Sequence, residues 1–392
     1  MYLTREQERM LNGEFGWVVA KAMSIIVKTG EALGATKLVE VAHAHVSGVS
    51  YSNILDPGLE FIRSLLLGGG RARVYTTVNP GCVDYSGLSE LIDGSYARKQ
   101  AVIDDSLIKM GFKPVFTCIP YYHRPPAQGE FLAWGESSAV AVANSVFGAS
   151  TNREGGPLAL ASALTGFTYY AGLHVPGNRV ARVLVHVKDP RVRGNPGALG
   201  LWLGYRVREI PLVRGAGQGL ADLKIMLAAS AASGSHALVV LEGVTPRGFY
   251  STDFVDRVEV EWGDVEEYIG TEPGGGSVLG YLGCPHLYPW EFLEVYRQVV
   301  KRGVLPRDRR LLITIPVEVF EKHYSEVLRL RRLGVDVAAG TCPVVSRLTR
   351  VFDHLVTNSG KAVFYLSKQL KANYYLTNTL GVIRAVYGER AG

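Results

Sequence analysis

From residue 277 to residue 343, short apolar runs alternate with helical segments, and this order restricts the chain to few folds. The apolar runs are 278–282, 311–315 and 335–339, and the predicted helices between them are 289–301 and 317–333. Strands that are joined through helices pair in parallel, because each connection has to cross the sheet before the next strand begins. The sequence therefore predicts an α/β protein with largely parallel sheets.

The part of the chain before residue 277 shows the same kind of alternation. A capping box at Thr4 opens a first short helix that ends at Gly13. The other predicted helices are 14–28, 57–67, 137–147 and 220–232, and the predicted strands are 37–46, 73–78, 180–187 and 237–241. A glycine-rich break at 272–276 is the best candidate boundary. We expect approximate subdomains at 1–150, 151–275 and 276–392.

Three of the four cysteines lie where an apolar run gives way to a turn that contains proline. They are Cys118, Cys284 and Cys342, and strand-like runs precede them at 115–116, 278–282 and 335–339. Proline cannot donate a ladder hydrogen bond, so it ends a strand and leaves a thiol at the carboxyl edge of the sheet. Ligands bind at that edge in α/β proteins. Three converging thiolates are one too few for a fully ligated four-iron cluster, so one iron stays open as a Lewis acid.

Each of these cysteines also has an ordinary interpretation, because free cysteine packs in cores as a small apolar side chain. The sequence has no Cys-x-x-Cys pair that would favour structural zinc, and nothing in it indicates an oxidising compartment that would favour disulfides. Cys82 lacks the strand-then-proline setting, and we interpret it as a thiol that is not a ligand.

Composition argues against several classes of function. The chain has 392 residues, 47% of them hydrophobic, which is enough for a large core. The net charge is only +6, from 42 basic and 36 acidic residues, and this balance is not typical of a nucleic-acid-binding protein. A small positive excess suits an anionic small substrate. We find no secretory leader and no apolar run of membrane-spanning length, so we expect a cytoplasmic protein.

Two turns are candidate anion sites. Gly48, Val49 and Ser50 follow a predicted strand and offer backbone N–H groups and a hydroxyl, which can form a nest for phosphate or carboxylate. An ordinary tight turn is the alternative, and the Gly-Lys-Ser ending of a P-loop is missing. Asn79 and Pro80 follow the next strand, either as a simple turn or with the amide facing a substrate.

Two predicted helix starts are further candidates. Ser138 and Ala139 offer a hydroxyl and N–H groups, although the neighbouring Glu136 can also be explained by the helix dipole alone. Lys361 lies near another helix start, where an ammonium group favours a carboxylate or phosphate, and a solvated lysine is the alternative. Three more residues stay open between a role in a site and ordinary packing: His174, Arg179 and His286.

Several of these segments together resemble motifs of the aconitase X family. In chain order they are 117–121, 135–140, 143–149, 151–155, 172–174, 178–179, 283–286, 341–343 and 357–361. Each motif is short, but the set follows the family's order from about residue 13 to about residue 387. The chain is similar to the branch of the family that acts on phosphomevalonate.

The resemblance implies an aconitase-like catalytic core, with several α/β/α subdomains and largely parallel sheets around a central cluster cleft. It implies an iron–sulfur cluster of the 4Fe–4S type with one open iron, held by Cys118, Cys284 and Cys342. The residues expected to line the substrate site are Gly48, Val49, Ser50, Asn79, Pro80, Ser138, Ala139 and Lys361.

The activity implied by the resemblance is that of a hydro-lyase in an archaeal-type mevalonate pathway. It is the dehydration of (R)-5-phosphomevalonate to trans-anhydromevalonate 5-phosphate. The family's dehydration of cis-3-hydroxy-L-proline stays an alternative, as does a structural subunit without a cluster. We identify no convincing general base in the chain. Aconitase-like enzymes use a serine on a swivelling lid domain, so we expect a separate small subunit to supply base and lid in a heterodimer, without nucleic acid or membrane partners.

Overall fold

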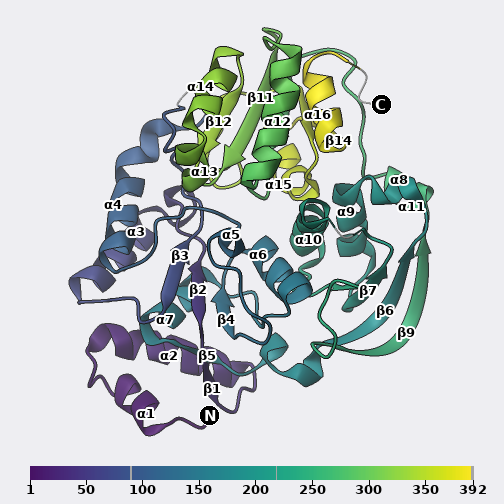
Figure 1. The fold of residues 1–392 in the computed structure, drawn as a ribbon. Helices are drawn as coiled ribbons and strands as arrows, with labels where there is room; N and C mark the ends of the chain where they lie inside the picture. Colours follow the sequence, from purple (N-terminus) through teal and green to yellow (C-terminus); the bar gives the residue numbers. More distant parts are fainter. Residues whose placement is uncertain (89–90, 218, 390–392) are drawn as a thin grey trace.

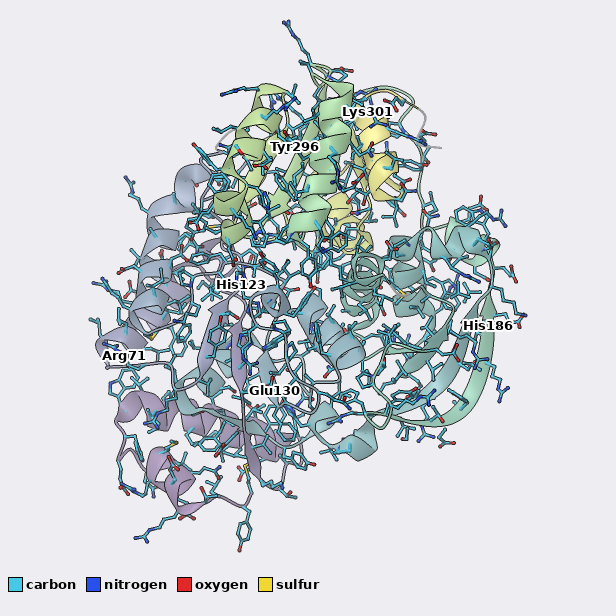
Figure 2. All side chains as sticks on the ribbon, viewed as in Figure 1. Arg71, His123, Glu130, His186, Tyr296 and Lys301 are labelled. Atoms are coloured by element: carbon cyan, nitrogen blue, oxygen red, sulfur yellow. The ribbon has the colours of Figure 1, made fainter. Side chains whose placement is uncertain are left out.

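The computed structural model describes residues 1–88, 91–217 and 219–389, which form three α/β units around a common centre. In Figure 1 the third unit lies at the top, the second at the right and the first at the lower left. Between them lie α5 (Pro120–His123), α6 (Ser137–Val142) and α10 (Leu220–Gly234). His123, at the end of α5, lies near the middle of the molecule in Figure 2. The predicted α/β class is confirmed.

The first unit is built on a three-stranded parallel sheet and a two-stranded antiparallel one. The parallel sheet has the order β3 (Tyr75–Val78), β2 (His43–Val46) and β4 (Leu132–Trp134), and the antiparallel pair joins β1 (Leu38–Glu40) to β5 (Phe167–Tyr169). The helices are α1 (Arg5–Leu11), α2 (Trp17–Ala32), α3 (Tyr51–Leu67), α4 (Ala97–Lys109) and α7 (Gly156–Thr165), with a 3₁₀ turn η1 (Gly94–Tyr96). Their apolar faces share one core with the sheets.

The single strand predicted at 37–46 is wrong, because the chain leaves one sheet and enters another at Val41 and Ala42. The N–H of Val41 donates to Gly166 O in the turn before β5, and the N–H of Ala42 donates to Phe131 O in front of β4. Successive residues therefore have partners in different sheets. Apolar residues are interspersed with polar ones along the whole run, and such a pattern cannot by itself mark a change of partner.

Two predicted helices differ from the observed ones at a defined residue. The helix predicted at 57–67 starts earlier, at Tyr51, and Leu55 interrupts it with φ 50°. Pro57 follows that kink, where its fixed φ suits a new helical start. The helix predicted at 137–147 ends as an α-helix at Val142 and continues as the π-helical turn η2 (Ala143–Phe147).

The second unit has a four-stranded parallel sheet in the order β8-β7-β6-β9. Its strands are β6 (Val180–Val187), β7 (Pro211–Arg214), β8 (Val240–Leu241) and β9 (Ser251–Val260). Its helical elements are α8 (Pro190–Arg193), α9 (Pro196–Arg206), α10 and α11 (Trp262–Glu266), preceded by the 3₁₀ turns η3 (Gly172–His174) and η4 (Pro176–Asn178). The prediction of a helix near 220–232 between two strands is confirmed.

The third unit has a five-stranded parallel sheet in the order β12-β11-β10-β13-β14. Its strands are β10 (Val278–Leu282), β11 (Arg309–Ile315), β12 (Asp336–Ala339), β13 (His354–Thr357) and β14 (Asn373–Leu376). Its helices are α12 (Pro289–Arg302), α13 (Val317–Lys322), α14 (Tyr324–Arg332), α15 (Gly360–Leu370) and α16 (Thr379–Val386). The helix predicted at 317–333 is two helices, because the backbone of His323 is not helical, with φ −116° and ψ 34°. None of the helices in the described part of the chain is both long and apolar enough to cross a membrane.

Two of the three cysteine loops follow a strand as predicted, and the third does not. Cys284 comes after β10, and Cys342 comes after β12. Gly283 makes the first turn possible, because its φ of +116° and the nearby Thr314 O, 2.3 Å from a Cβ built there, exclude a side chain. The strand predicted at 115–116 is wrong.

The segment before Cys118 is irregular because Phe116 has a positive φ of 38°. The segment nevertheless lies beside β3, since the N–H of Lys113 donates to Thr76 O and the N–H of Thr117 donates to Val78 O. Cys118 therefore reaches the carboxyl end of the first parallel sheet without a strand of its own.

Substitution of Gly200 tests the packing of the second unit. A Cβ built on Gly200 of α9 would lie 2.3 Å from Met226 O and 2.6 Å from the Ala229 Cβ of α10. Alanine usually stabilises a helix relative to glycine by about 1 kcal/mol, but here overpacking should make Gly200→Ala destabilising by about 1–3 kcal/mol. The measurement is urea unfolding followed by circular dichroism. The control is Gly263→Ala in α11, where the space is open; equal stability of the two variants would contradict the prediction.

Candidate functional site

The three cysteine loops meet at the centre of the molecule through hydrogen bonds. The backbone N–H of His286, two residues after Cys284, donates to the Sγ of Cys118 at 3.2 Å. The ring Nε2 of His286 lies 3.0 Å from the carbonyl oxygen of Thr341, the residue before Cys342. Segments that are far apart in the sequence are thus brought into one place.

All three thiols are buried, and burial raises the pKa of each. The pKa is well above its ordinary value for Cys118 and reaches about 12 for Cys342, and the pKa of Cys284 is also raised. Hydrogen-bond donors oppose this effect at each sulfur: the N–H of His286 at Cys118, the hydroxyl of Ser359 at Cys284 and the N–H of Val344 at Cys342. Buried thiolates at this place therefore need positive charge nearby.

Lys361 provides that charge, in a buried ion pair with Glu136. Its ammonium group donates to Glu136 Oε1 and lies 3.4 Å from the hydroxyl of Ser137. Burial alone would raise the pKa of Glu136, but Lys361 and Ser138 outweigh burial and lower this pKa to about 2. Burial alone would lower the pKa of Lys361, but the charge and hydrogen bond of Glu136, together with Cys284 and Cys118, outweigh burial and raise this pKa.

The Lys361 charge also acts on the cysteines. It lowers the pKa of Cys284 more than any other neighbouring group does, and it also opposes the raised pKa values of Cys118 and Cys342. The sequence predicted Lys361 as a substrate-binding cation at a helix start. The structure places it in the first turn of α15, between a carboxylate and three thiols.

A directed chain of hydrogen bonds leads to Glu136 from the first sheet. Asn79 Nδ2 donates to Glu136 Oε2 at 3.0 Å, so Asn79 Oδ1 accepts from His45 Nε2 at 3.2 Å. With the proton of His45 on Nε2, its Nδ1 accepts from the hydroxyl of Thr77 at 2.8 Å. The Thr77 oxygen in turn accepts from His43 Nε2 at 2.8 Å. Every donor points toward Glu136.

Burial favours the neutral form of both histidines in this chain of hydrogen bonds. Burial lowers the pKa of His45 to about 4, and it lowers the pKa of His43 well below the usual value. The predicted site residue Asn79 therefore has a fixed amide orientation, with its oxygen facing His45 and its nitrogen facing Glu136. A neutral donor chain of this kind stabilises the carboxylate without adding a second cation.

The glycine turn at 47–50 has free backbone donors. Within the described residues, the N–H groups of Gly48, Val49 and Ser50 have no hydrogen-bond partner, and Gly48 is exposed. Gly48 has φ +70°, which reverses the chain after β2. The Ser50 hydroxyl is already used, because it donates to Val345 O at 2.5 Å. The turn can therefore offer N–H groups to an anion, but its hydroxyl connects it to the Cys342 loop.

The remaining predicted substrate residues lie around the same centre. Ser138 is held by Glu136, which accepts its N–H at 3.2 Å and its hydroxyl at 3.0 Å. The N–H of Ala139 has no partner among the residues that the structure describes. Pro80 follows Asn79 in the turn after β3 and precedes Gly81, whose N–H donates to Gly340 O at 3.3 Å.

Cys82 and two of the residues left open by the sequence are held by contacts of their own. Cys82 is buried, and its Sγ lies 3.2 Å from Gln100 Oε1. Arg179 donates to Leu173 O and to the Ser150 hydroxyl, at 2.7 and 2.9 Å. His174 also contacts Ser150. Arg179 also donates to Phe249 O and lies over the Phe249 ring of the second unit, so Arg179 and His174 are explained as packing where the first and second units meet. Burial also raises the pKa of the neighbouring Glu154 to about 7.

The thiols fit an iron–sulfur cluster better than a single metal ion. Among the described residues, no three His, Cys, Asp or Glu side chains are placed to chelate one ion. In a cluster, each thiolate binds a different iron, so the sulfurs need not surround one point. An all-thiolate set with N–H and O–H donors to the sulfurs is typical of iron–sulfur sites.

Sequence reasoning missed the polar residues that hold this centre. Glu136 was explained by a helix dipole, and Thr77 and the two histidines of β2 were not considered. The spacing contained a signal, because His43 and His45 are two apart and so face the same side of β2. Thr77 and Asn79 have the same spacing.

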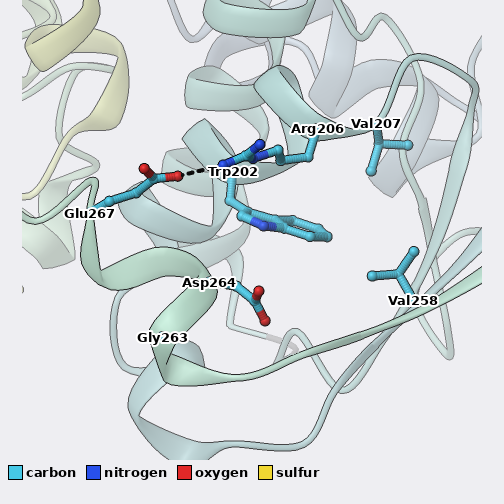
Figure 3. Close-up of a pocket in the computed structure, with 7 residues that line it drawn as sticks. All are labelled: Trp202, Arg206, Val207, Val258, Gly263, Asp264 and Glu267. Atoms are coloured by element: carbon cyan, nitrogen blue, oxygen red, sulfur yellow. Dashed lines mark hydrogen bonds and ion pairs between the residues drawn. The ribbon is translucent and has the colours of Figure 1, made fainter.

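A large surface cavity lies away from this centre. It has a volume of about 520 Å³ and is lined in the second unit by Trp202, Arg206, Val207, Val258, Gly263, Asp264 and Glu267 (Figure 3). Arg206 donates to Glu267 at 2.9 Å, so its charge is paired. The cavity contains none of the predicted site residues.

Comparison with known proteins gives one family for the whole chain. Models of the aconitase X first, second and third domains match residues 1–177, 181–270 and 278–388. The solved structure titled "Crystal structure of Thermococcus kodakaraensis aconitase X (holo-form)" superposes with a TM-score of 0.88 at 34% identity, covering 99% of this chain and 100% of that one.

Curated relatives carry two names. The phosphomevalonate dehydratase large subunit of Aeropyrum pernix is 40% identical over 94% of this chain and 96% of its own length. That of Methanocaldococcus jannaschii is 34% identical over 95% of this chain and 96% of its own length. The cis-3-hydroxy-L-proline dehydratase of Pseudomonas aeruginosa is 29% identical over 98% of this chain but only 70% of its own length.

Removal of one member of the central ion pair should destabilise the protein strongly. Lys361→Met leaves the Glu136 charge buried and unpaired, which costs about 3–5 kcal/mol. The double variant Glu136→Gln/Lys361→Met should lose much less than the sum of the single losses. Because the lowered Glu136 pKa makes its contribution present above about pH 4.3 and lost as pH falls through about 2, these differences should be constant near neutral pH.

Urea unfolding of the single and double variants measures these differences. The matched control is Lys109→Met, which breaks an exposed pair with Asp105 and should change stability by less than about 1 kcal/mol. If Lys361→Met unfolded at the same urea concentration as the parent chain, the ion pair would not have the importance assigned to it.

Proposed function

Because the chain belongs to the aconitase X family, we propose that it is the large, catalytic subunit of a phosphomevalonate dehydratase. The relatives with this name match over nearly their whole length, whereas the hydroxyproline dehydratases extend well beyond the matched part. The reaction removes a proton from C2 and hydroxide from C3 of (R)-5-phosphomevalonate. A C=C bond forms, and trans-anhydromevalonate 5-phosphate and water are the products.

The observation that carries this proposal is the meeting of three loops that each carry a buried thiol, with the buried ammonium group of Lys361 nearby. Cys118, Cys284 and Cys342 come from three loops, and Lys361 acts electrostatically on each of them. Burial favours the neutral thiol, whereas the hydrogen-bond donors and Lys361 favour the thiolate. A purely structural subunit has no evident need for three thiols in such surroundings. The arrangement supports a catalytic role.

We assign these three cysteines as the ligands of a 4Fe–4S cluster. A cluster held by three thiolates has one iron without a protein ligand, and such an iron is a Lewis acid toward a hydroxyl group. The residues of this chain contribute the rest of the environment. His286, Ser359 and Val344 donate hydrogen bonds to the sulfurs, and the buried centre excludes water.

The substrate is held by backbone N–H groups in this proposal. The free donors of Gly48, Val49 and Ser50 bind one anionic group of the substrate, and the N–H of Ala139 is a further donor. Asn79, Pro80, Ser138 and Lys361 complete the site. Lys361 shares its charge with Glu136, so it shapes the local field and is not a free cation.

The general base is assigned to a partner. The side chains near the thiols that could accept a proton are already engaged: Glu136 is ionised but holds several donors, and His45 and His286 are hydrogen-bonded on both ring nitrogens. A smaller subunit, which the name of the relatives implies, would bring the base, expected to be a serine, and would close over the site. We propose a cytoplasmic heterodimer.

The activity test uses anaerobically loaded chain together with its small subunit. We expect conversion of 5-phosphomevalonate to the anhydro product, and little or no conversion by either subunit alone. Product formation is followed by mass spectrometry as loss of water. Conversion of cis-3-hydroxy-L-proline instead would assign the chain to the other activity of the family, and full activity of the chain alone would contradict the two-subunit proposal.

The ligand assignment is tested by single serine substitutions. Cys118→Ser, Cys284→Ser and Cys342→Ser should each lose most bound iron and sulfide, because a hydroxyl is a poor replacement for a thiolate ligand. The matched control is Cys82→Ser, which should bind as much as the parent chain. Iron and sulfide analysis after anaerobic reconstitution gives the answer, and a full complement in any of the first three variants removes that residue from the ligand set.

A further inference from the structure

His286 uses every polar group that it has, and its bonds lead to different parts of the centre. The side chain is fully buried. Its backbone N–H donates to Cys118 Sγ at 3.2 Å, its carbonyl accepts from Lys224 Nζ at 2.8 Å, and its ring nitrogens lie 3.1 Å from Thr117 Oγ1 and 3.0 Å from Thr341 O. Burial alone accounts for the need for partners, and it is the location of these partners in different segments that distinguishes His286.

The partners fix the ring in one tautomer. A carbonyl oxygen can only accept, so the bond to Thr341 places the proton on Nε2 of His286. Nδ1 then accepts from the hydroxyl of Thr117. The oxygen of that hydroxyl also accepts the N–H of Ile119 at 3.2 Å. Neither the ring nor the hydroxyl can turn without losing a bond.

The side-chain partners of His286 are sequence neighbours of two of the cysteines. Thr117 directly precedes Cys118, Thr341 directly precedes Cys342, and His286 itself follows Cys284 by two residues. One imidazole therefore connects all three thiol loops. The irregular backbone before Cys118 is held at β3 by the N–H of Thr117, and the imidazole adds a second attachment at the same residue through its hydroxyl.

The carbonyl of His286 adds a fourth connection, to the second unit. Lys224 lies on α10 with its side chain fully buried, and it forms an ion pair with Glu291 at the start of α12. The Glu291 carboxylate also accepts the N–H of Tyr288 at 2.9 Å. The loop that carries Cys284 is therefore attached to the other two thiol loops through the ring and N–H of His286. It is attached to the second unit through the carbonyl of His286.

We infer that His286 is a positioning residue that sets the relative places of the three cluster-binding thiols and supplies the N–H donor to the Cys118 sulfur. The inference rests on the proposed function, because it assumes that the thiols hold a cluster. Partners of this kind behind metal ligands change metal affinity by about 10–100-fold when they are removed.

The test is Thr117→Val, which removes the hydroxyl bonded to the ring and keeps the shape of the side chain. The cluster should be lost to an iron chelator about tenfold faster than from the parent chain. The electron paramagnetic resonance spectrum of the reduced cluster should also change, since the Cys118 sulfur shifts relative to its N–H donor. His286→Leu should show a larger loss, and His286→Gln, which keeps an N–H for Thr341, should recover part of it.

The matched control is Thr245→Val, outside the site. The Thr245 hydroxyl is also buried, donates to Ser145 O at 2.6 Å and accepts the N–H of Leu241 at 2.8 Å. Thr245→Val therefore removes one donated and one accepted hydrogen bond, as Thr117→Val does. The control should lose similar stability and keep the cluster as long as the parent chain does.

The outcomes separate this inference from the proposed function. If the parent chain takes up no iron and sulfide on anaerobic reconstitution, the proposed function and this inference both fail. If the parent chain binds the cluster and Thr117→Val releases it no faster than Thr245→Val, with an unchanged resonance spectrum, the proposed function stands and the role of His286 is overturned.

Discussion

The buried ammonium of Lys361 is the charge on which the centre of this protein depends. Burial alone favours the neutral forms of lysine, glutamate and cysteine, so none of these groups is charged there on its own account. Lys361 is charged beside its direct partner Glu136, and its positive charge opposes the raised pKa values of the three thiols, whereas the charge of Glu136 raises the pKa of Cys118 and of Cys284. An unpaired member would cost several kcal/mol. The loops that carry these groups are therefore constrained to assemble as a set.

The topology explains how such a set can form from distant segments. Parallel pairing places the loops after β10 and β12 at the same edge of the third sheet, with β11 between them. The first sheet meets this edge through the bridge between Gly81 and Thr341 and through Ser50, which donates to Val345 O. The site is thus a junction of units, and its geometry depends on contacts between them as much as on the strands within them.

This dependence decides which parts could be predicted from the sequence. The settings of Cys284 and Cys342 were readable because a strand followed by proline is a local pattern, whereas the strand predicted before Cys118 was wrong because Phe116 adopts a positive φ. The partnership of Lys361 with Glu136 joins residues 225 positions apart. A local sequence pattern cannot show a contact between residues so far apart in the chain. The register that brings His45 opposite Thr77 is likewise determined only when the sheet forms.

The side chains at the centre are hydrogen-bonded to one another, and this limits their ability to accept a proton from a substrate. The side chains of Glu136, His45 and His286 are engaged with neighbours, so each would have to break a bond before it could accept a proton from a substrate. The donors left free in the described residues include the backbone N–H groups at Gly48 to Ser50 and at Ala139, and these can bind an anion but cannot take up a proton. Rigid, fully bonded walls suit the placing of a cofactor and an anionic substrate. This saturation with internal hydrogen bonds is the physical reason why the proposed function assigns the general base to a second chain.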